Sequence, residues 1–235
     1  MTWKLHFTHT GYCTSNRAEV LQGEKREKIR FYATIGILVH PNHGLVLFDV
    51  GYHDQFYDQT KTFPYSIYAK ITPVFHSPEE NAKSRLEALG YRAEDVSIVV
   101  ISHFHADHTA GLDDLRPFSF QLGSVPIYAQ KRVLENLSYR FNYIFSDENK
   151  YPGAPSVQQN IVENKPFLLG NLEVVPIKVN HGKLKIFGYR FKDVAYLTDV
   201  KTIDLSEFST GMYKLKVNWN AGENEYYNEE EIVIP

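Results

Sequence analysis

His103-Phe104-His105-Ala106-Asp107-His108 directly follows the apolar stretch Val96-Ser97-Ile98-Val99-Val100-Ile101. Four potential metal ligands therefore stand within six residues at the end of a predicted buried strand. In an extended chain His103 and His105 point to the same side, so their imidazoles can bind one cation. Asp107 and His108 then fall in a turn, from which they can reach a second cation. Imidazole combined with carboxylate is typical of hydrolytic metal sites.

An alternative explanation of the same motif is a polar loop in which Asp107 caps the next helix and the histidines are merely exposed. That explanation suits any one of these residues. Four of them at this spacing favour the metal site.

A metal-binding motif of this form after a buried strand resembles the signature of the metallo-β-lactamase superfamily of metallohydrolases. The resemblance implies an α/β fold, an αββα sandwich of two mixed sheets with helices outside and a dinuclear site at one edge. It also implies that His181 completes the first metal site and that Asp199 bridges both metals. By this resemblance the first metal is held by His103, His105 and His181, and the second by Asp107, His108 and Asp199.

The segment Leu47-Phe48-Asp49-Val50-Gly51 resembles the family motif in which an acid lies behind the metal ligands. Asp49 is then expected to orient a histidine ligand. An ordinary turn aspartate before glycine is the alternative.

Different parts of the chain resemble different branches of the superfamily. The first hundred residues, with Thr10 to Arg17 and a long insertion around residues 57–75, resemble the lactonase-like branch. Residues from about 103 to 200 resemble the cyclic-phosphate phosphodiesterase branch. Lys201 and Thr202 follow Val200, where the lactonase branch usually has a tyrosine. This favours the phosphodiesterase interpretation.

The end of the chain departs from the family pattern. Members normally complete the second metal site with a late histidine, and no histidine follows His181. The second site is therefore expected to be incomplete, with water in its remaining positions. We assign residues 1–205 to the hydrolase domain. Residues 206–235 alternate polar and apolar positions around a turn, which predicts a hairpin-like tail packed on the same domain.

We accordingly expect a metal-dependent hydrolase that uses a metal-bound hydroxide on a small, cyclic phosphodiester. Two divalent cations are the implied cofactors, with zinc first and manganese or iron as alternatives. Asp107 is expected to act on a proton as well as bind metal. A lactonase or other ester hydrolase is one alternative. A catalytically impaired scaffold that binds a metal or a ligand is the other.

The composition is consistent with this interpretation. The 235 residues are 43% hydrophobic, which is enough for one large domain. The formal charge of −3 argues against a nucleic-acid polymer as partner. Cys13 is the sole cysteine, so an internal disulfide is excluded. Because the sequence shows no apolar leader and no stretch of membrane-spanning length, we expect a cytoplasmic location and no membrane partner. The expected substrate is a small molecule. The aromatic insertion is expected to form either a homodimer contact or a lid over the pocket.

The pattern of apolar residues predicts strands at residues 3–8, 31–39, 45–48, 96–101, 125–129 and 172–179. A strand ending at Asp199 is expected from residue 195. Ser77-Pro78-Glu79-Glu80 predicts a capping box that opens a helix to about Leu89. A helix is expected at residues 130–137, and residues 139–162 are expected to form a substrate-facing loop.

Overall fold

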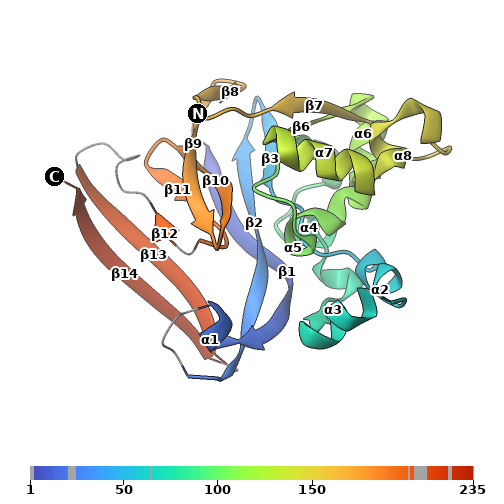
Figure 1. The fold of residues 1–235 in the computed structure, drawn as a ribbon. Helices are drawn as coiled ribbons and strands as arrows, with labels where there is room; N and C mark the ends of the chain where they lie inside the picture. The colour runs from blue at the N-terminus through green and yellow to red at the C-terminus, as the bar shows by residue number, and fades with distance from the viewer. Residues whose placement is uncertain are drawn as a thin grey trace.

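The computed structural model describes residues 3–20, 25–63, 65–200, 202–203, 211–221 and 224–234. They form two β-sheets that face each other, and helices cover the outer side of the larger sheet (Figure 1). The fold is the α/β sandwich that the metal-binding motif predicts.

The larger sheet has nine strands in the described ranges, and its main path runs β14-β13-β2-β3-β5-β6-β7, with β1 and β4 attached beside β2. Its strands are β1 (Lys4–Asn16), β2 (Lys28–His40), β3 (Gly44–Phe48), β4 (Val74–Phe75), β5 (Val96–Val100), β6 (Val125–Ala129), β7 (Val157–Ile161), β13 (Gly211–Ala221) and β14 (Asn224–Ile234). The smaller sheet contains β8 (Phe167–Leu169), β9 (Leu172–His181), β10 (Leu184–Phe191), β11 (Val194–Tyr196) and β12 (Thr202–Ile203).

Along the chain, most helices follow one strand of the larger sheet and precede another. The α-helices are α1 (Arg17–Val20), α2 (Gln55–Gln59), α3 (Tyr65–Ile71), α4 (Ala82–Ala88), α5 (Ala106–Thr109), α6 (Arg116–Leu122), α7 (Lys131–Arg140) and α8 (Asn142–Phe145). The 3-10 helices are η1 (Pro78–Glu80), η2 (Ala93–Asp95), η3 (Ala110–Leu115) and η4 (Asp147–Asn149). Among the described residues, none of these helices is long and apolar enough to span a membrane.

Strands β3, β5, β6 and β7 run parallel to one another. Parallel strands bring their carboxyl ends to one edge of a sheet, where loops collect functional residues. Asp49 follows β3 and the metal-binding motif follows β5, so the sheet itself brings the acid and the histidines together.

Two separate cores hold the layers together. One core packs the helices against the larger sheet, with Leu86, Leu112 and Leu137 fully buried against strand residues such as Val99. The other core fills the space between the two sheets. Its members include Phe48 and Val100 from the larger sheet and Tyr189, Phe191 and Tyr196 from the smaller one.

Several sequence-based predictions of elements need correction. The helix expected from Ser77 does not begin there: η1 ends at Glu80, and Asn81 caps α4 by accepting a hydrogen bond from the Ser84 amide at 2.8 Å. Asn81 has extended backbone angles, which break the predicted helix in two. Strand β1 also continues to Asn16, because Gly11 adopts a φ of +121° at an irregularity that preserves pairing with β2.

Three further expectations are corrected. Residues 139–162 are not a continuous loop, since they contain α8, η4 and β7. Asp107 and His108 do not lie in an open turn: they belong to the short helix α5. The strand expected to end at Asp199 stops at Tyr196.

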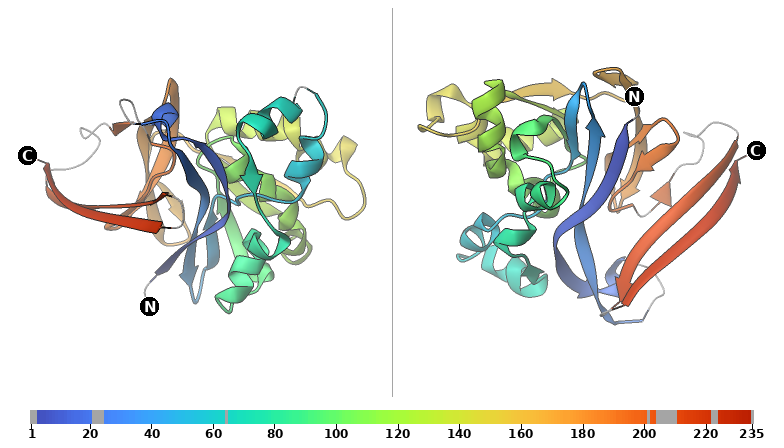
Figure 2. Two further views of the ribbon diagram at one scale, coloured as in Figure 1. Left: turned by 90° about the horizontal axis from the view of Figure 1, so that it is seen from below. Right: turned by 180° about the vertical axis from the view of Figure 1, so that it is seen from behind.

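The expected hairpin near the chain end is present. Strands β13 and β14 pair antiparallel from Gly211↔Ile234 to Ala221↔Asn224, and Asn220 pairs with Arg30 of β2. In the views of Figures 1 and 2 the smaller sheet lies between this hairpin and strands β1 and β2. The division of the chain at residue 205 stays a prediction.

Candidate metal centre

Four chain segments bring the predicted ligands together. His103 and His105 follow β5, Asp107 and His108 lie in α5, His181 ends β9, and Asp199 follows β11. The potential ligand atoms form two groups, and within each group they lie within 4.8 Å of one another. The first group is His103, His105, His181 and Asp199; the second is Asp107, His108 and Asp199. The structure thus reproduces the two expected groups and places Asp199 in both.

Asp49 lies behind the second group and is fully buried. Its Oδ2 atom is 2.8 Å from Nδ1 of His108. A carboxylate can only accept, so Nδ1 of His108 carries a hydrogen, and Nε2 is the nitrogen that a bound cation would contact. The Ser102 amide also donates to Asp49, at 2.8 Å from Oδ1. Asp49 therefore lies in contact with a predicted histidine ligand, and its orienting role stays a prediction.

Ser102 performs a similar role for His103. Its hydroxyl oxygen is 2.8 Å from Oδ2 of Asp49 and 3.1 Å from Nδ1 of His103. Because the single hydroxyl hydrogen of Ser102 goes to the carboxylate, Nδ1 of His103 donates to the hydroxyl oxygen. The lone pair of His103 then lies on Nε2, which faces the other ligand atoms.

The charges in the cluster are strongly coupled. Burial lowers the pKa of His103. Burial opposes a charge on His108 as well, but the carboxylates of Asp107 and Asp49 outweigh it and raise the pKa of His108 well above its ordinary value. Burial also works against ionised Asp199, yet its contacts with His103, His105 and His108 hold the pKa of its carboxyl well below the usual range. The cluster therefore favours the ionised form of the Asp199 carboxyl group.

The donor arrangement fits divalent cations. Nε2 of His103 lies 3.1 Å from Nδ1 of His105 and 3.2 Å from Oδ2 of Asp199. Nε2 of His108 lies 3.3 Å from Asp107 Oδ2 and 3.4 Å from Asp199 Oδ2. In both places lone pairs converge on one another, an arrangement that a shared positive charge stabilises. Imidazole and carboxylate are also the donors that zinc, manganese and iron accept.

One side of the cluster is buried and the other faces solvent. His103 and His108 are 0% and 2% exposed, whereas the side chain of His105 is 45% exposed. The side chains of Asp199 and His181 are about one-third exposed. A substrate can therefore reach the cluster from the side of His105 and His181.

Asp49 and Asp199 share an unusual backbone conformation. Their φ angles are +62° and +52°, in the left-handed region that costs a residue other than glycine about 1–3 kcal/mol. Each acid directly follows or nearly follows a strand, and the turn directs its carboxylate into the cluster. Among the described residues, Lys192 in the turn between β10 and β11 is the third residue other than glycine with a positive φ, at +53°.

Three residues in the site have no signal in the sequence motif: Ser102, Tyr196 and Thr198. Tyr196 places its hydroxyl 3.0 Å from Oδ2 of Asp49, and Thr198 donates to the Ser102 hydroxyl oxygen at 3.3 Å. Both contacts cross from the smaller sheet to the larger one. Sequence spacing carries no information on such contacts, because they depend on how the two sheets pack.

Other candidates from the sequence lie outside the cluster. Cys13 is partly buried, and burial, assisted by the charge of Asp107, raises the pKa of its thiol to about 11. The thiol is protonated at neutral pH, which agrees with an unreactive cysteine. Asp113 and Arg116 lie 3.9 Å apart in the segment after the motif, and Tyr143 donates to Asp113 at 2.8 Å. Both charged side chains therefore have partners in the fold.

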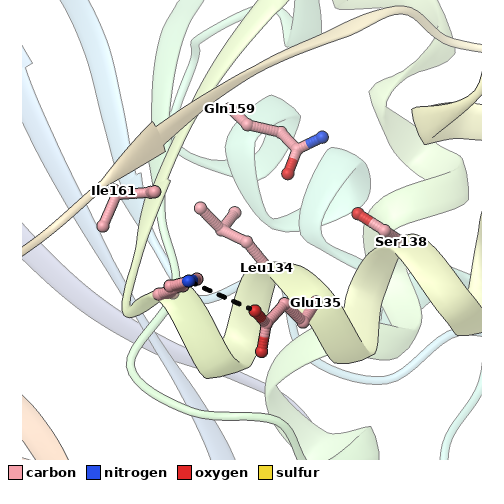
Figure 3. Close-up of a pocket in the computed structure, with 6 residues that line it drawn as sticks. Leu134, Glu135, Ser138, Gln159 and Ile161 are labelled. Atoms are coloured by element: carbon pink, nitrogen blue, oxygen red, sulfur yellow. Dashed lines mark ion pairs between the residues drawn. The ribbon is translucent and has the colours of Figure 1, made fainter.

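Two surface hollows lie beside helix α7 in the helical layer. One lies between α7 and β7 and is lined by Leu134, Glu135, Ser138, Gln159 and Ile161, together with Lys131 (Figure 3). It contains no predicted metal ligand. The other is lined by Phe104, Asn136, Tyr139, Arg140 and Asn142. Phe104 stands between two metal-binding histidines in the chain, so this second hollow borders the motif.

Comparison with known families identifies the class of protein. The family model described as "Beta-lactamase superfamily domain" matches residues 71–218. The chain therefore belongs to the β-lactamase superfamily, in its metallo-β-lactamase form, as its fold and ligand groups indicate. This fold implies a divalent-metal site.

Curated relatives match only in part. The octanoyltransferase of Porphyromonas gingivalis is 36% identical over 124 residues, which are 52% of this chain and 25% of that protein. The N-acyl homoserine lactonase of Bacillus cereus is 25% identical over 174 residues, which are 74% of this chain and 62% of that protein. The chain thus spans less than two thirds of the length of either relative.

Solved structures share the fold. A diphosphatase of the PhnP family superimposes with a TM-score of 0.52 and 23% identity, covering 87% of this chain and 69% of the other. An N-acyl homoserine lactone hydrolase with N-hexanoyl-L-homoserine at its catalytic metal centre gives a TM-score of 0.54 and 17% identity. That match covers 80% of this chain and 70% of the other.

Proposed function

We propose that the chain is a metal-dependent hydrolase acting on a small phosphodiester, with a cyclic phosphate as the favoured form. The observation that carries this proposal is the pair of ligand groups that share Asp199. Two adjacent divalent cations, when bound, lower the pKa of water to about 7 and stabilise the charge that develops on the reacting oxygen atoms. Zinc is the favoured cation, with manganese and iron as alternatives.

The residues of the chain divide the remaining tasks. His103, His105 and His181 would hold one cation, and Asp107 and His108 the other, with Asp199 between them. Asp49 fixes the ring of His108, so that its Nε2 lone pair faces the cluster. Asp107 is the candidate catalytic proton acceptor. Burial alone would raise its pKa, but His108 lowers it, so Asp107 is ionised at neutral pH.

The phosphodiester interpretation is supported by the incompleteness of the second group. It contains three donors among the described residues, against four in the first group. A catalytic site keeps coordination positions open for water or substrate. An anionic phosphate offers two oxygens to such positions, whereas a lactone carbonyl offers one. Lys201 and Thr202 after the bridging acid also differ from the lactonase pattern.

A lactone is the second candidate substrate. The relative from Bacillus cereus is named as an N-acyl homoserine lactonase and matches 74% of this chain. The same ligand groups could serve attack on a ring carbonyl.

The decisive experiment compares turnover of bis(4-nitrophenyl) phosphate with turnover of N-hexanoyl homoserine lactone, with zinc and manganese each supplied. We expect the phosphodiester to be hydrolysed faster. Faster hydrolysis of the lactone would replace the first candidate by the second. Turnover of neither by a folded, metal-loaded protein would contradict both and leave a binding scaffold.

Two variants test the site itself. His105→Ala and Asp107→Ala should each lower turnover by at least about a hundredfold while the fold survives. Removing a residue that only supports a metal ligand already costs up to about a hundredfold, and loss of a ligand itself should cost at least as much. His43→Ala is the matched control, because His43 precedes β3 and so lies at the opposite end of that strand from Asp49. Wild-type turnover in His105→Ala or Asp107→Ala would contradict the assignment.

A further inference from the structure

The smaller sheet reaches across the sandwich through two buried tyrosines. Tyr189 lies on β10 and is 0% exposed, and Tyr196 ends β11 and is 3% exposed. The hydroxyl of Tyr189 donates to the main-chain carbonyl of Ile101 at 3.1 Å. The hydroxyl of Tyr196 instead lies 3.0 Å from Oδ2 of Asp49 and 2.9 Å from the carbonyl oxygen of Thr34. The two tyrosines are similar in burial but differ in the groups they contact.

The contact with Asp49 places Tyr196 behind the second ligand group. The same Oδ2 atom accepts from Nδ1 of His108 at 2.8 Å. The single hydroxyl hydrogen of Tyr196 has two acceptors within reach, and the ionised carboxylate of Asp49 is the stronger one. With Ser102, His108 and Tyr196 all donating to it, Oδ2 is held in place, and the imidazole that it orients is held with it. Burial, reinforced by the charge of Asp49, raises the pKa of Tyr196 well above its ordinary value, so its hydroxyl keeps the hydrogen.

Tyr196 also stands three residues before Asp199. Between them, Thr198 donates to the Ser102 hydroxyl oxygen, which in turn donates to Asp49. The segment that carries Asp199 is therefore attached to the larger sheet at two points, and both attachments lead to the same buried carboxylate. Asp199 takes a φ of +52°, a conformation that requires such support from its surroundings.

We propose that Tyr196, assisted by Thr198, is a positioning residue that joins the two sheets at Asp49 and thereby sets the places of His108 and Asp199 for metal binding. The inference rests on the proposed metal site. It assigns the smaller sheet a role beyond packing: its tyrosine hydroxyl controls the geometry of the second ligand group, whereas the first group keeps three histidines that Tyr196 does not touch.

The test compares Tyr196→Phe with Tyr189→Phe. Each substitution removes one buried hydroxyl at similar depth, so Tyr189→Phe controls for the loss of such a group. Tyr196→Phe should lose the larger amount of thermal stability, because its hydroxyl contacts a buried carboxylate. Zinc affinity is measured on the intact chain by competition with a chromogenic chelator, and cobalt substitution supplies a visible spectrum of the site. We expect Tyr196→Phe to weaken the second equivalent of metal about tenfold or more and to alter the cobalt spectrum. Tyr189→Phe should change the affinity less than about twofold.

Thr198→Val provides a second variant, since it removes the hydroxyl and keeps the shape of the side chain. A smaller weakening of the second metal equivalent is expected. Equal metal affinities in Tyr196→Phe and Tyr189→Phe, with two equivalents bound to the wild type, would overturn the positioning role and leave the proposed function intact. A wild type that binds no metal would overturn the proposed function, and the positioning role with it.

Discussion

At the scale of single residues, the buried carboxylate of Asp49 organises the site. It accepts hydrogen bonds from the Ser102 amide, the Ser102 hydroxyl and His108 while remaining fully buried. A buried acid without such donors would cost several kcal/mol, so these contacts and Asp49 stabilise one another. In the proposed site the candidate ligand His108 would depend on this residue, although Asp49 does not belong to either ligand group.

Replacing Asp49 by asparagine should therefore weaken the second metal equivalent by about 10- to 100-fold. The amide nitrogen of asparagine is itself a hydrogen-bond donor. It would therefore face the donors of Ser102 and His108 without accepting from them, whereas the carboxylate oxygen accepts from both. Isothermal titration with zinc measures the change. Asp147→Asn is the control, because that side chain is fully exposed at 102%. An unchanged affinity in Asp49→Asn would exclude the orienting role.

A second residue-scale prediction concerns His53 and Asp114. Their Nε2 and Oδ1 atoms lie 3.3 Å apart, and the hydrogen bond to Asp114 raises the pKa of His53 against the opposing effect of burial. Since the folded pKa exceeds the unfolded value near 6.5, the pair stabilises the fold fully below about pH 6.5. This contribution is lost as the pH rises through the folded pKa.

The Asp114→Asn variant should therefore be less stable than the wild type below pH 6.5, by about 0.5–1 kcal/mol, and the difference should shrink towards pH 9. Urea unfolding at several pH values measures it. Asp58→Asn is a control, because Asp58 pairs with Lys61 at an exposed position and involves no histidine. A difference that grows with pH would contradict the assignment.

At the scale of elements, glycine turns set how closely the strands approach the site. Gly51 has a φ of +71°, and a Cβ atom there would lie 2.0 Å from Oγ1 of Thr10. Thr10 accepts a hydrogen bond from the Tyr52 amide at 2.9 Å, so this contact attaches the loop after β3 to β1. Gly90 has a similar φ of +80°, but a Cβ atom there would meet nothing within 4 Å.

The comparison of Gly51→Ala with Gly90→Ala separates backbone strain from steric overlap. Gly90→Ala should cost about 1–2 kcal/mol, the strain of a left-handed residue. Gly51→Ala should cost at least about 1–3 kcal/mol more, because overpacking adds to the strain. Chemical denaturation measures both. Equal losses in the two variants would show that the close approach to Thr10 has no consequence.

The limits of prediction from sequence also appear at this scale. The strands that carry the site are strongly apolar, and their positions agree closely with the predicted ones: β3 and β6 match within a residue. The capping box at Ser77 is wrong as a helix start, since Asn81 offers a side chain that caps the Ser84 amide better. Local patterns cannot decide between two adjacent capping residues when tertiary packing selects one.

The residues of the candidate metal centre could be predicted from the sequence about as well as the secondary-structure elements. The motif from His103 to His108 contains its chemistry in consecutive residues, and its spacing alone predicts a cluster. His181 and Asp199 follow only from the family resemblance, because strand patterns do not show which strand ends meet. Ser102, Tyr196 and Thr198 could not be predicted, since their hydrogen bonds require the register of two packed sheets.

At the scale of the whole molecule, the metal site lies where the chain brings both sheets and a helix together. Ligands come from β5, α5, β9 and the segment after β11, which are widely separated in sequence. In the proposed site, cations bound between these segments would connect the sheets. Binding to the folded state alone stabilises it, by about 2.7 kcal/mol at a cation concentration one hundred times the Kd.

Chelation should consequently lower the melting temperature. Removal of metal with a strong chelator should reduce it by about 5–10 °C for a chain of this size, and added zinc should restore it. Differential scanning calorimetry provides the measurement. His105→Ala should show a smaller response, while His43→Ala should behave like the wild type. An identical melting temperature with and without chelator would contradict a metal that connects the sheets.

The central claim is that this chain holds two divalent cations in ligand groups that share Asp199. Elemental analysis of freshly purified protein, before any chelator or added metal, tests it most directly. The account predicts about two equivalents of zinc, manganese or iron per chain, and a clear fall in Asp199→Ala. A folded wild-type sample that contains no metal and takes up none when it is supplied would contradict the account.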